Sequence, residues 1–122
     1  MDNYEKEAKE LYSKTKVYKE YEVKTKSYTT EKWEKVNEGL NAIFSEFASL
    51  KGTSTTSDKA QALVKKLQEY ISENYYTCTD EILEGLGQMY TSDPRFKENI
   101  DKYGEGTTEF VASAITHFCK AK

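Results

Sequence analysis

Residues 29–50, TTEKWEKVNEGLNAIFSEFASL, decide the fold class of this chain. Apolar residues recur there every three or four positions, as one face of a helix requires: Trp33, Val36, Leu40, Ile43, Phe44, Phe47 and Leu50. Thr29 and Thr30 each carry a hydroxyl that can cap the helix N-terminus. Gly52 and the polar residues 53–56 end the pattern. The stretch therefore predicts a long amphipathic helix.

The remainder of the chain repeats this kind of pattern. Ser57 and Asp58 begin a second predicted helix, which ends near Tyr75 and Tyr76. Thr79 can cap a third helix, and residues 93–94, Asp-Pro, are typical of the start of a fourth. The glycines at 104 and 106 separate it from a last helix over about 107–118. With one Pro in the whole chain and no convincing alternating run, we predict an all-α bundle of about five helices.

Two glycines interrupt the third predicted helix. Gly85 and Gly87 each destabilise a helix by up to about 1 kcal/mol relative to Ala. The presence of two glycines in one helix therefore predicts close packing at these positions, against a neighbouring helix or a ligand.

The first 28 residues differ from the rest. Their apolar residues are sparse among many charges, and a helix over roughly 3–14 has a narrow apolar face. Such a segment buries too little apolar surface to offset the entropy of ordering it. We therefore divide the chain into an N-terminal arm, residues 1–28, which we expect to become ordered only when something fills the space beneath it, and a helical domain, residues 29–122.

Size and charge restrict the classes of function. The 122 residues suit one domain, and a net charge of −3 with Lys dispersed among Asp and Glu lacks the basic footprint of a nucleic-acid-binding protein. No membrane span or signal peptide is recognisable, so we expect a cytoplasmic protein without membrane contact, monomeric in isolation. Two cysteines are too few for a disulfide framework, and we expect both to be reduced.

Cys78 is the candidate reactive residue. It lies at or just before a predicted helix N-terminus, where the helix dipole stabilises a thiolate, although Asp80 and Glu81 oppose this effect. A thiolate is a soft nucleophile suited to addition onto an electron-poor alkene. The alternative is a buried cysteine that packs as a small hydrophobic residue.

The other catalytic and metal-binding patterns are incomplete. His117 is the single histidine and lies in the last predicted helix, away in sequence from Cys78, so neither a Cys-His hydrolase nor haem ligation is supported. The chain has no ligand pairs with zinc spacing and no glycine-rich phosphate loop after a strand. We expect no enzymatic activity, no cofactor and no metal.

A longer combination of motifs carries more information than any of these residues alone. It comprises Tyr76-Thr77-Cys78-Thr79, Glu81, the run Gly85-Leu86-Gly87 with Met89-Tyr90, Asp93-Pro94-Arg95-Phe96, and upstream Ser27-Tyr28-Thr29 with Trp33. This combination resembles the signature of the TipAS antibiotic-recognition domain family and covers nearly the whole chain. Thr77 departs from the pattern, because Pro is expected there, so the loop that carries Cys78 should be less rigid.

The resemblance implies a globin-like helical fold without haem, with an aromatic cleft for large apolar antibiotics such as thiopeptides. It also implies an N-terminal segment that is flexible when the cleft is empty and folds over the bound drug. Thiopeptides contain dehydroalanine, to which the family's cysteine can add, and Cys78 is the matching residue. The domain commonly forms the C-terminal half of MerR-type transcription regulators and also occurs alone. The resemblance therefore implies sequestration of a drug, with sensing for a longer transcription activator as the alternative.

Aromatic residues make up 13% of the chain, with ten Tyr and five Phe. They either fill a small core or wall a ligand cleft, because aromatic rings offer a large contact area at a low entropic cost. We expect Phe44, Phe47 and Phe110 to lie deeper in the fold. We expect the other ligand-binding residues to lie nearer the ligand: Trp33, Tyr75, Tyr76, Met89, Tyr90 and Phe96. A groove that binds a partner helix is a further alternative.

Overall fold

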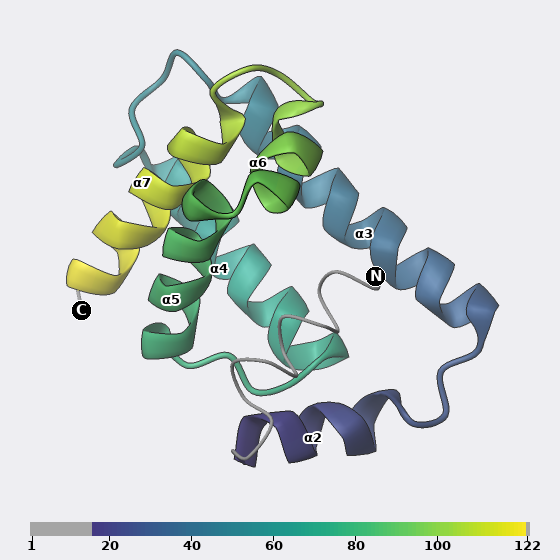
Figure 1. The fold of residues 1–122 in the computed structure, drawn as a ribbon. Coiled ribbons are helices and arrows are strands. Elements are labelled where there is room, and N and C mark those ends of the chain that lie inside the picture. The colour runs from purple at the N-terminus through teal and green to yellow at the C-terminus, as the bar shows by residue number, and fades with distance from the viewer. Residues whose placement is uncertain (1–15, 122) are drawn as a thin grey trace.

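The computed structural model describes residues 16–121, and every regular element in that range is a helix (Figure 1). The helices are α2 (Lys16–Thr25), α3 (Thr30–Ser49), α4 (Asp58–Asn74), α5 (Asp80–Ser92), α6 (Pro94–Asp101) and α7 (Thr107–Lys120). The predicted all-α fold is therefore confirmed.

Four helices begin where the sequence predicts. At each start a side-chain oxygen accepts a hydrogen bond from a backbone N–H of the first turn, at Thr29, Ser57, Thr79 and Asp93. Pro94 occupies the first turn of α6, where its missing N–H costs no helical hydrogen bond. Local sequence thus determines these four boundaries.

The start of α7 is stabilised from a neighbouring helix. Gly106 precedes α7 with φ 87°, a left-handed conformation that favours glycine. Because Gly106 has no side chain to cap the helix, Asp101 at the end of α6 does so. Its Oδ1 accepts hydrogen bonds from Thr108 N at 2.9 Å and from Thr108 Oγ1 at 2.7 Å. Burial acts to raise the pKa of Asp101, but the Thr108 bonds and the nearby lysines outweigh it and lower the pKa.

The core lies between α3, α4, α5 and α7, and α5 packs most extensively against α7. Gly87 permits this approach, because a Cβ there would lie 3.3 Å from Cγ2 of Ile115. The expected close packing is thus found at Gly87. Gly85 is different: it is exposed, and a Cβ there would meet no atom within 4 Å. The expectation that a neighbouring helix requires Gly85 is wrong.

Helix α2 lies across the lower edge of the molecule in Figure 1, apart from the α3–α7 bundle. None of the extensive helix pairs in the described range includes α2. Tyr21 is its one fully described side chain that is buried, while Val23 is 77% exposed. We did not predict a helix at residues 16–25, and the one predicted over about 3–14 lies outside the described residues.

No helix within residues 16–121 combines the length and the apolarity that a membrane crossing requires.

Candidate functional site

Five aromatic rings from three parts of the chain meet where α2 approaches the rest of the protein. We call Tyr21, Tyr28, Trp33, Tyr75 and Tyr76 the aromatic cluster. Tyr21 stacks on Tyr75 with ring centroids 6.4 Å apart and an interplanar angle of 10°. Trp33 contacts both Tyr28 and Tyr75, with ring centroids 5.1 Å and 6.2 Å apart respectively. The cluster therefore links α2, the start of α3 and the segment that follows α4.

Polar contacts fasten α2 to the same segment. Lys24 Nζ donates to the backbone oxygen of Ser72 at 2.8 Å, and Thr77 Oγ1 donates to Glu20 Oε2 at 2.6 Å. The threonine that departs from the family pattern at 77 thus provides an anchor that Pro lacks. Glu20 and Lys24 lie on either side of Tyr21 in the sequence, so α2 is held at three residues between positions 20 and 24.

Tyr28 adds a further link, between the α2–α3 connection and the end of α4. Its hydroxyl donates to the backbone oxygen of Asn74 at 2.8 Å, and Lys32 Nζ lies 5.4 Å from the centroid of its ring. Burial and the nearby Glu73 carboxylate raise the pKa of Tyr28. The hydroxyl therefore remains a hydrogen-bond donor at neutral pH.

A hollow of about 750 Å³ adjoins the aromatic cluster. We call it the α2 hollow, and its lining is Lys19, Tyr21, Glu22, Val23, Thr25, Lys26 and Trp33. Rings and an exposed valine provide apolar contact area, while two lysines, a glutamate and a threonine provide polar groups. The lining is thus mixed, with three apolar or aromatic and four polar side chains, and the volume lies within the range of small-molecule sites, about 300 to 1,000 Å³.

Cys78 lies in the segment that connects α4 to α5, and its side chain is buried, with 5% exposed. Its N–H donates to Ser72 Oγ at 3.0 Å, and its carbonyl accepts from Gln68 Nε2 at 3.0 Å. Burial, followed by Cys119 and Asp80, raises the pKa of the Cys78 thiol to about 12. Burial thus outweighs the helix N-terminus, and the thiol is protonated in this arrangement. Within residues 16–121, neither cysteine forms a disulfide bond.

The remaining predicted ligand residues lie in other parts of the core. Phe44 packs edge-on against Tyr90 at 5.7 Å, and Tyr90 contacts Phe96 at 5.8 Å. Phe47 forms a separate edge contact with Phe110 at 6.4 Å. Met89 is half-buried against the core. The structure therefore brings Trp33, Tyr75 and Tyr76 together in the aromatic cluster, but places the other rings in two further groups.

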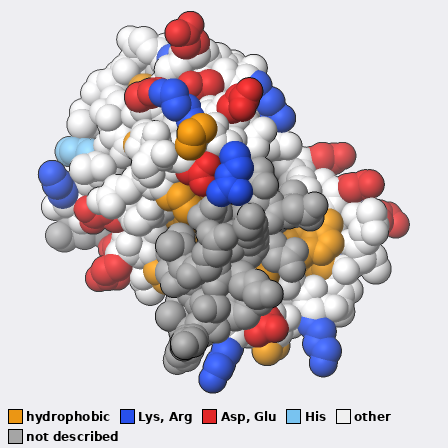
Figure 2. All heavy atoms as spheres, in the orientation of Figure 1, with side chains coloured by type: hydrophobic (Ala, Val, Ile, Leu, Met, Phe, Trp, Pro, Cys, Tyr) orange, Lys and Arg blue, Asp and Glu red, His pale blue; other side chains and the backbone are white. Residues whose placement is uncertain are grey.

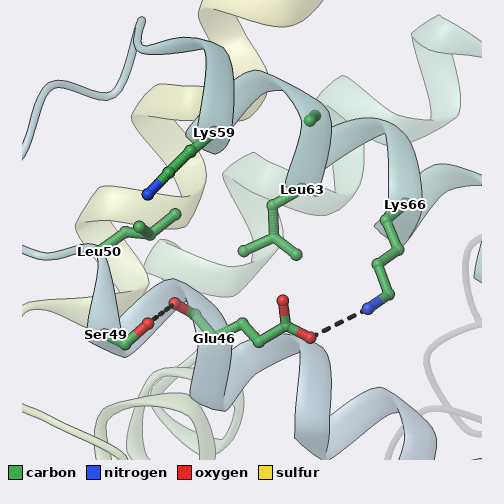
Figure 3. Close-up of a pocket in the computed structure, with 7 residues that line it drawn as sticks. Glu46, Ser49, Leu50, Lys59, Leu63 and Lys66 are labelled. Atoms are coloured by element: carbon green, nitrogen blue, oxygen red, sulfur yellow. Dashed lines mark hydrogen bonds and ion pairs between the residues drawn. The ribbon is translucent and has the colours of Figure 1, made fainter.

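Two other grooves are poorer candidates for a large apolar ligand. One, of about 300 Å³, lies between the end of α3 and the start of α4. Figure 3 shows its Leu63 floor, with the Glu46–Lys66 ion pair of 3.0 Å alongside. The other, of about 440 Å³, lies between α5 and α7 and has exposed His117 at its edge. Neither is lined by an aromatic ring apart from the His117 imidazole, in contrast to the α2 hollow.

Charges give no indication of a polyanionic ligand. On the face shown in Figure 2, acidic and basic side chains are interspersed rather than separated. Among the described residues, no three His, Cys, Asp or Glu side chains are grouped to hold a metal ion. The α2 hollow with its aromatic cluster is therefore the best candidate site.

Sequence reasoning missed most of this region. Tyr21, Tyr28 and the residues of α2 that line the hollow were not predicted as site residues, and neither were Gln68 and Ser72. A signal for the last two exists, because residues four apart on a helix share one face. What that face contacts depends on how α4 lies against the following segment, which sequence alone does not give.

The chain resembles proteins of known function over most of its length. The family model of the TipAS antibiotic-recognition domain matches residues 4–118. The HTH-type transcriptional activator mta of Bacillus subtilis (strain 168) is 31% identical over 116 residues, which cover 95% of this chain and 45% of that protein. The HTH-type transcriptional activator TipA of Streptomyces coelicolor is 33% identical over 116 residues, which cover 93% of this chain and 46% of that protein. The chain thus spans less than half the length of these relatives.

A solved structure agrees with these matches. It is TipAS from Streptomyces lividans in complex with nosiheptide, described as part of a thiopeptide antibiotic multidrug resistance system. The TM-score is 0.84 at 31% identity, over 98% of this chain and 85% of that one.

Proposed function

The chain belongs to the TipAS antibiotic-recognition domain family, and on that premise we propose that it binds a large, mainly apolar antibiotic of the thiopeptide class in the α2 hollow. The observation that carries the proposal is the 750 Å³ hollow beside the aromatic cluster, in a chain that matches a thiopeptide-bound relative along nearly its whole length. The protein acts by binding and is not an enzyme.

Recognition combines apolar contact with a few polar groups. Tyr21 and Trp33 offer ring surface to an apolar ligand, and Val23 extends this surface along α2. Lys19 and Lys26 supply donors to ligand carbonyls, of which peptide-derived antibiotics have many. Tyr75 and Tyr76 are fully buried, and they pack against the rings of Tyr21 and Trp33 from the protein interior. The more distant predicted rings, at 44, 47, 90, 96 and 110, with Met89, would take part only if the ligand extends the site.

The predicted cover of the helical domain, residues 29–122, is the N-terminal arm, residues 1–28, of which the structure describes residues 16–28. In support, α2 is held by the contacts of Tyr21 with two rings and by a few hydrogen bonds rather than by extensive helix packing. Elements with few buried apolar contacts are those that open locally without global unfolding. Opening of α2 would admit the ligand, and closure would bury it.

Cys78 is the residue for covalent attachment. Addition of its thiol to a dehydroalanine breaks the S–H bond and the π bond of the alkene, and forms a bond from Sγ to the β-carbon and a bond from the proton to the α-carbon. The addition releases no leaving group and requires no oxidant. The buried, protonated thiol implies that attachment follows binding and requires the segment 75–79 to move.

Calorimetric titration with nosiheptide, the ligand of the related structure, tests the proposal. We expect saturable 1:1 binding that Trp33→Ala weakens at least about tenfold, because an aromatic anchor at such a site contributes roughly 1–2 kcal/mol or more. Tyr103→Ala is a matched control, since Tyr103 is also half-buried but does not line the hollow. Absence of binding by the unaltered protein, or equal losses in both variants, would contradict the proposal.

Intact-mass measurement tests the covalent step separately. Incubation should add the ligand's mass to the unaltered protein but not to Cys78→Ser. An unchanged mass for both proteins would refute covalent attachment and leave reversible binding in place.

A second candidate function is the ligand-sensing part of a longer MerR-type transcription activator. It is favoured because both relatives named above are transcriptional activators and this chain matches less than half of each. In that case a DNA-binding domain is encoded upstream of Met1, which sequencing of the gene tests directly. In either case we propose cytoplasmic action, and for the isolated domain a monomer.

A further inference from the structure

One face of α4 holds both backbone polar groups of Cys78. Gln68 and Ser72 lie four residues apart, one helical turn, and both side chains face the segment that follows α4. Ser72 Oγ accepts the N–H of Cys78 at 3.0 Å, and Gln68 Nε2 donates to its carbonyl at 3.0 Å. Such groups are costly to leave unpaired when buried, so the two side chains fix the backbone of Cys78 against α4.

Gln68 makes a second contact with the same segment. Its Nε2 also donates to Asp80 Oδ1 at 2.9 Å, so both protons of this amide are in use. Asp80 is the first residue of α5, where a carboxylate is favoured by the helix dipole. One carboxamide therefore fixes the residue that bears the thiol and the carboxylate two residues later.

The thiol of this anchored residue is shielded from solvent. The Cys78 side chain is 5% exposed, and burial, Cys119 and Asp80 together raise its pKa to about 12. A thiol with that pKa is about 0.001% thiolate at pH 7, compared with about 1% for a pKa of 9. Since the thiolate is the nucleophile, the restrained thiol is nearly inert.

From this geometry we infer that Gln68 is a positioning residue for Cys78. Its carboxamide keeps the thiol from small electrophiles in solution and reserves it for a ligand whose binding moves the segment 75–79. This inference rests on the proposed function, namely that Cys78 captures a bound antibiotic. It adds the residue that makes the capture selective.

The contacts of α2 supply a route by which a ligand can release the restraint. Lys24 of α2 donates to the carbonyl of Ser72, and the hydroxyl oxygen of Ser72 accepts the N–H of Cys78. Glu20 of α2 accepts a hydrogen bond from Thr77 Oγ1. The α2 hollow is lined largely by α2 itself. A ligand seated there therefore acts on the helix that is fastened to Ser72 and Thr77, both on the N-terminal side of Cys78.

Alkylation kinetics test the inference without any antibiotic. In a Cys119→Ser background Cys78 is the only thiol, and its reaction with iodoacetamide is followed by mass from pH 6 to 11. Gln68→Met keeps the shape of the side chain and removes both donors. We expect the midpoint of the pH–rate profile to fall by about one unit or more, and the rate at pH 7.5 to rise about tenfold.

Gln88→Met is the matched control, because Gln88 is exposed on α5 and should leave the profile unchanged. A purely structural role of Gln68 would lower the melting temperature but leave the midpoint where it is. A Gln68→Met profile that superimposes on that of the background overturns the inference. If Gln68→Met fails to fold, Ser72→Ala removes the other anchor. We expect its midpoint to fall as well, and an unchanged midpoint there overturns the inference equally.

Parallel incubation with nosiheptide separates this inference from the proposed function. A shifted Gln68→Met profile without a nosiheptide adduct on the unaltered protein refutes covalent capture but supports the restraint. An adduct together with an unshifted profile supports capture and refutes the role of Gln68.

Discussion

Replacement of Tyr21 with Ala should free α2 without unfolding the rest of the protein. Tyr21 is 3% exposed and contacts two rings, Tyr75 at 6.4 Å and Tyr76 at 6.5 Å. Truncating a large buried aromatic side chain costs about 3–5 kcal/mol. The contacts that would remain, such as the hydrogen bond from Lys24 to Ser72, are partly exposed and contribute about 1 kcal/mol each. Tyr21 therefore supplies most of the free energy that docks α2.

A loss of about 3 kcal/mol raises the population of undocked α2 roughly 150-fold. Hydrogen exchange measured by mass spectrometry reports this population for each peptide. We expect peptides from residues 16–28 to exchange about 100-fold faster in Tyr21→Ala, with α5 and α7 unchanged. Val23→Ala is the control, because that side chain is 77% exposed on the same helix. Equal acceleration in all helices would show that α2 is part of the cooperative core, and unchanged exchange in α2 would refute the anchoring role of Tyr21.

Three further predictions concern individual residues. Gly85→Ala should raise the melting temperature by about 4 °C, because the new methyl group meets open space and Ala stabilises a helix by up to about 1 kcal/mol relative to Gly. Gly87→Ala is the control and should give no gain or a loss, because its Cβ would crowd the packed Ile115. Asp101→Asn should lower the melting temperature at pH 7, and the difference in melting temperature from the unaltered protein should vanish as the pH falls well below 3.8. The folded state lowers the pKa of the Asp101 carboxylate, so the stability that this carboxylate contributes is lost as it protonates. An equal difference at every pH would contradict this. The free energy of unfolding measured in urea should fall as the pH rises from 9 towards 12, because the folded state retains the Cys78 proton that the unfolded state releases near pH 9. Cys78→Ala should make this decline shallower, and an identical decline in both proteins would contradict the raised pKa of Cys78.

Local sequence was sufficient for most helix boundaries and insufficient for α2. The side chains of Thr29, Ser57, Thr79 and Asp93 cap helices by contacts with residues two or three positions away, so their effect can be read directly from the sequence. Helix α2 has one buried ring among its fully described side chains, and its docking depends on residues about 50 positions later. No periodicity within α2 reveals that contact.

The candidate site was predicted in its composition but not in its pairings. Trp33, Tyr75 and Tyr76 were identified as ligand-binding candidates, and the structure brings them together through Tyr21, which was overlooked. Phe44 and Phe110 are also aromatic but lie elsewhere in the core, because aromatic character does not determine which helix face a ring meets. The two readings of Cys78, nucleophile or buried residue, are compatible: the thiol is buried in this structure, and its restraint depends on Gln68, ten residues earlier.

Trp33 offers the most direct test of ligand binding in the α2 hollow. It is the only tryptophan, so the protein gives one indole N–H signal in an NMR spectrum, and that indole lies at the wall of the hollow. Titration with nosiheptide should shift this signal and saturate at one equivalent. A Trp33 signal that stays in place while the ligand saturates the protein would show that the antibiotic binds elsewhere.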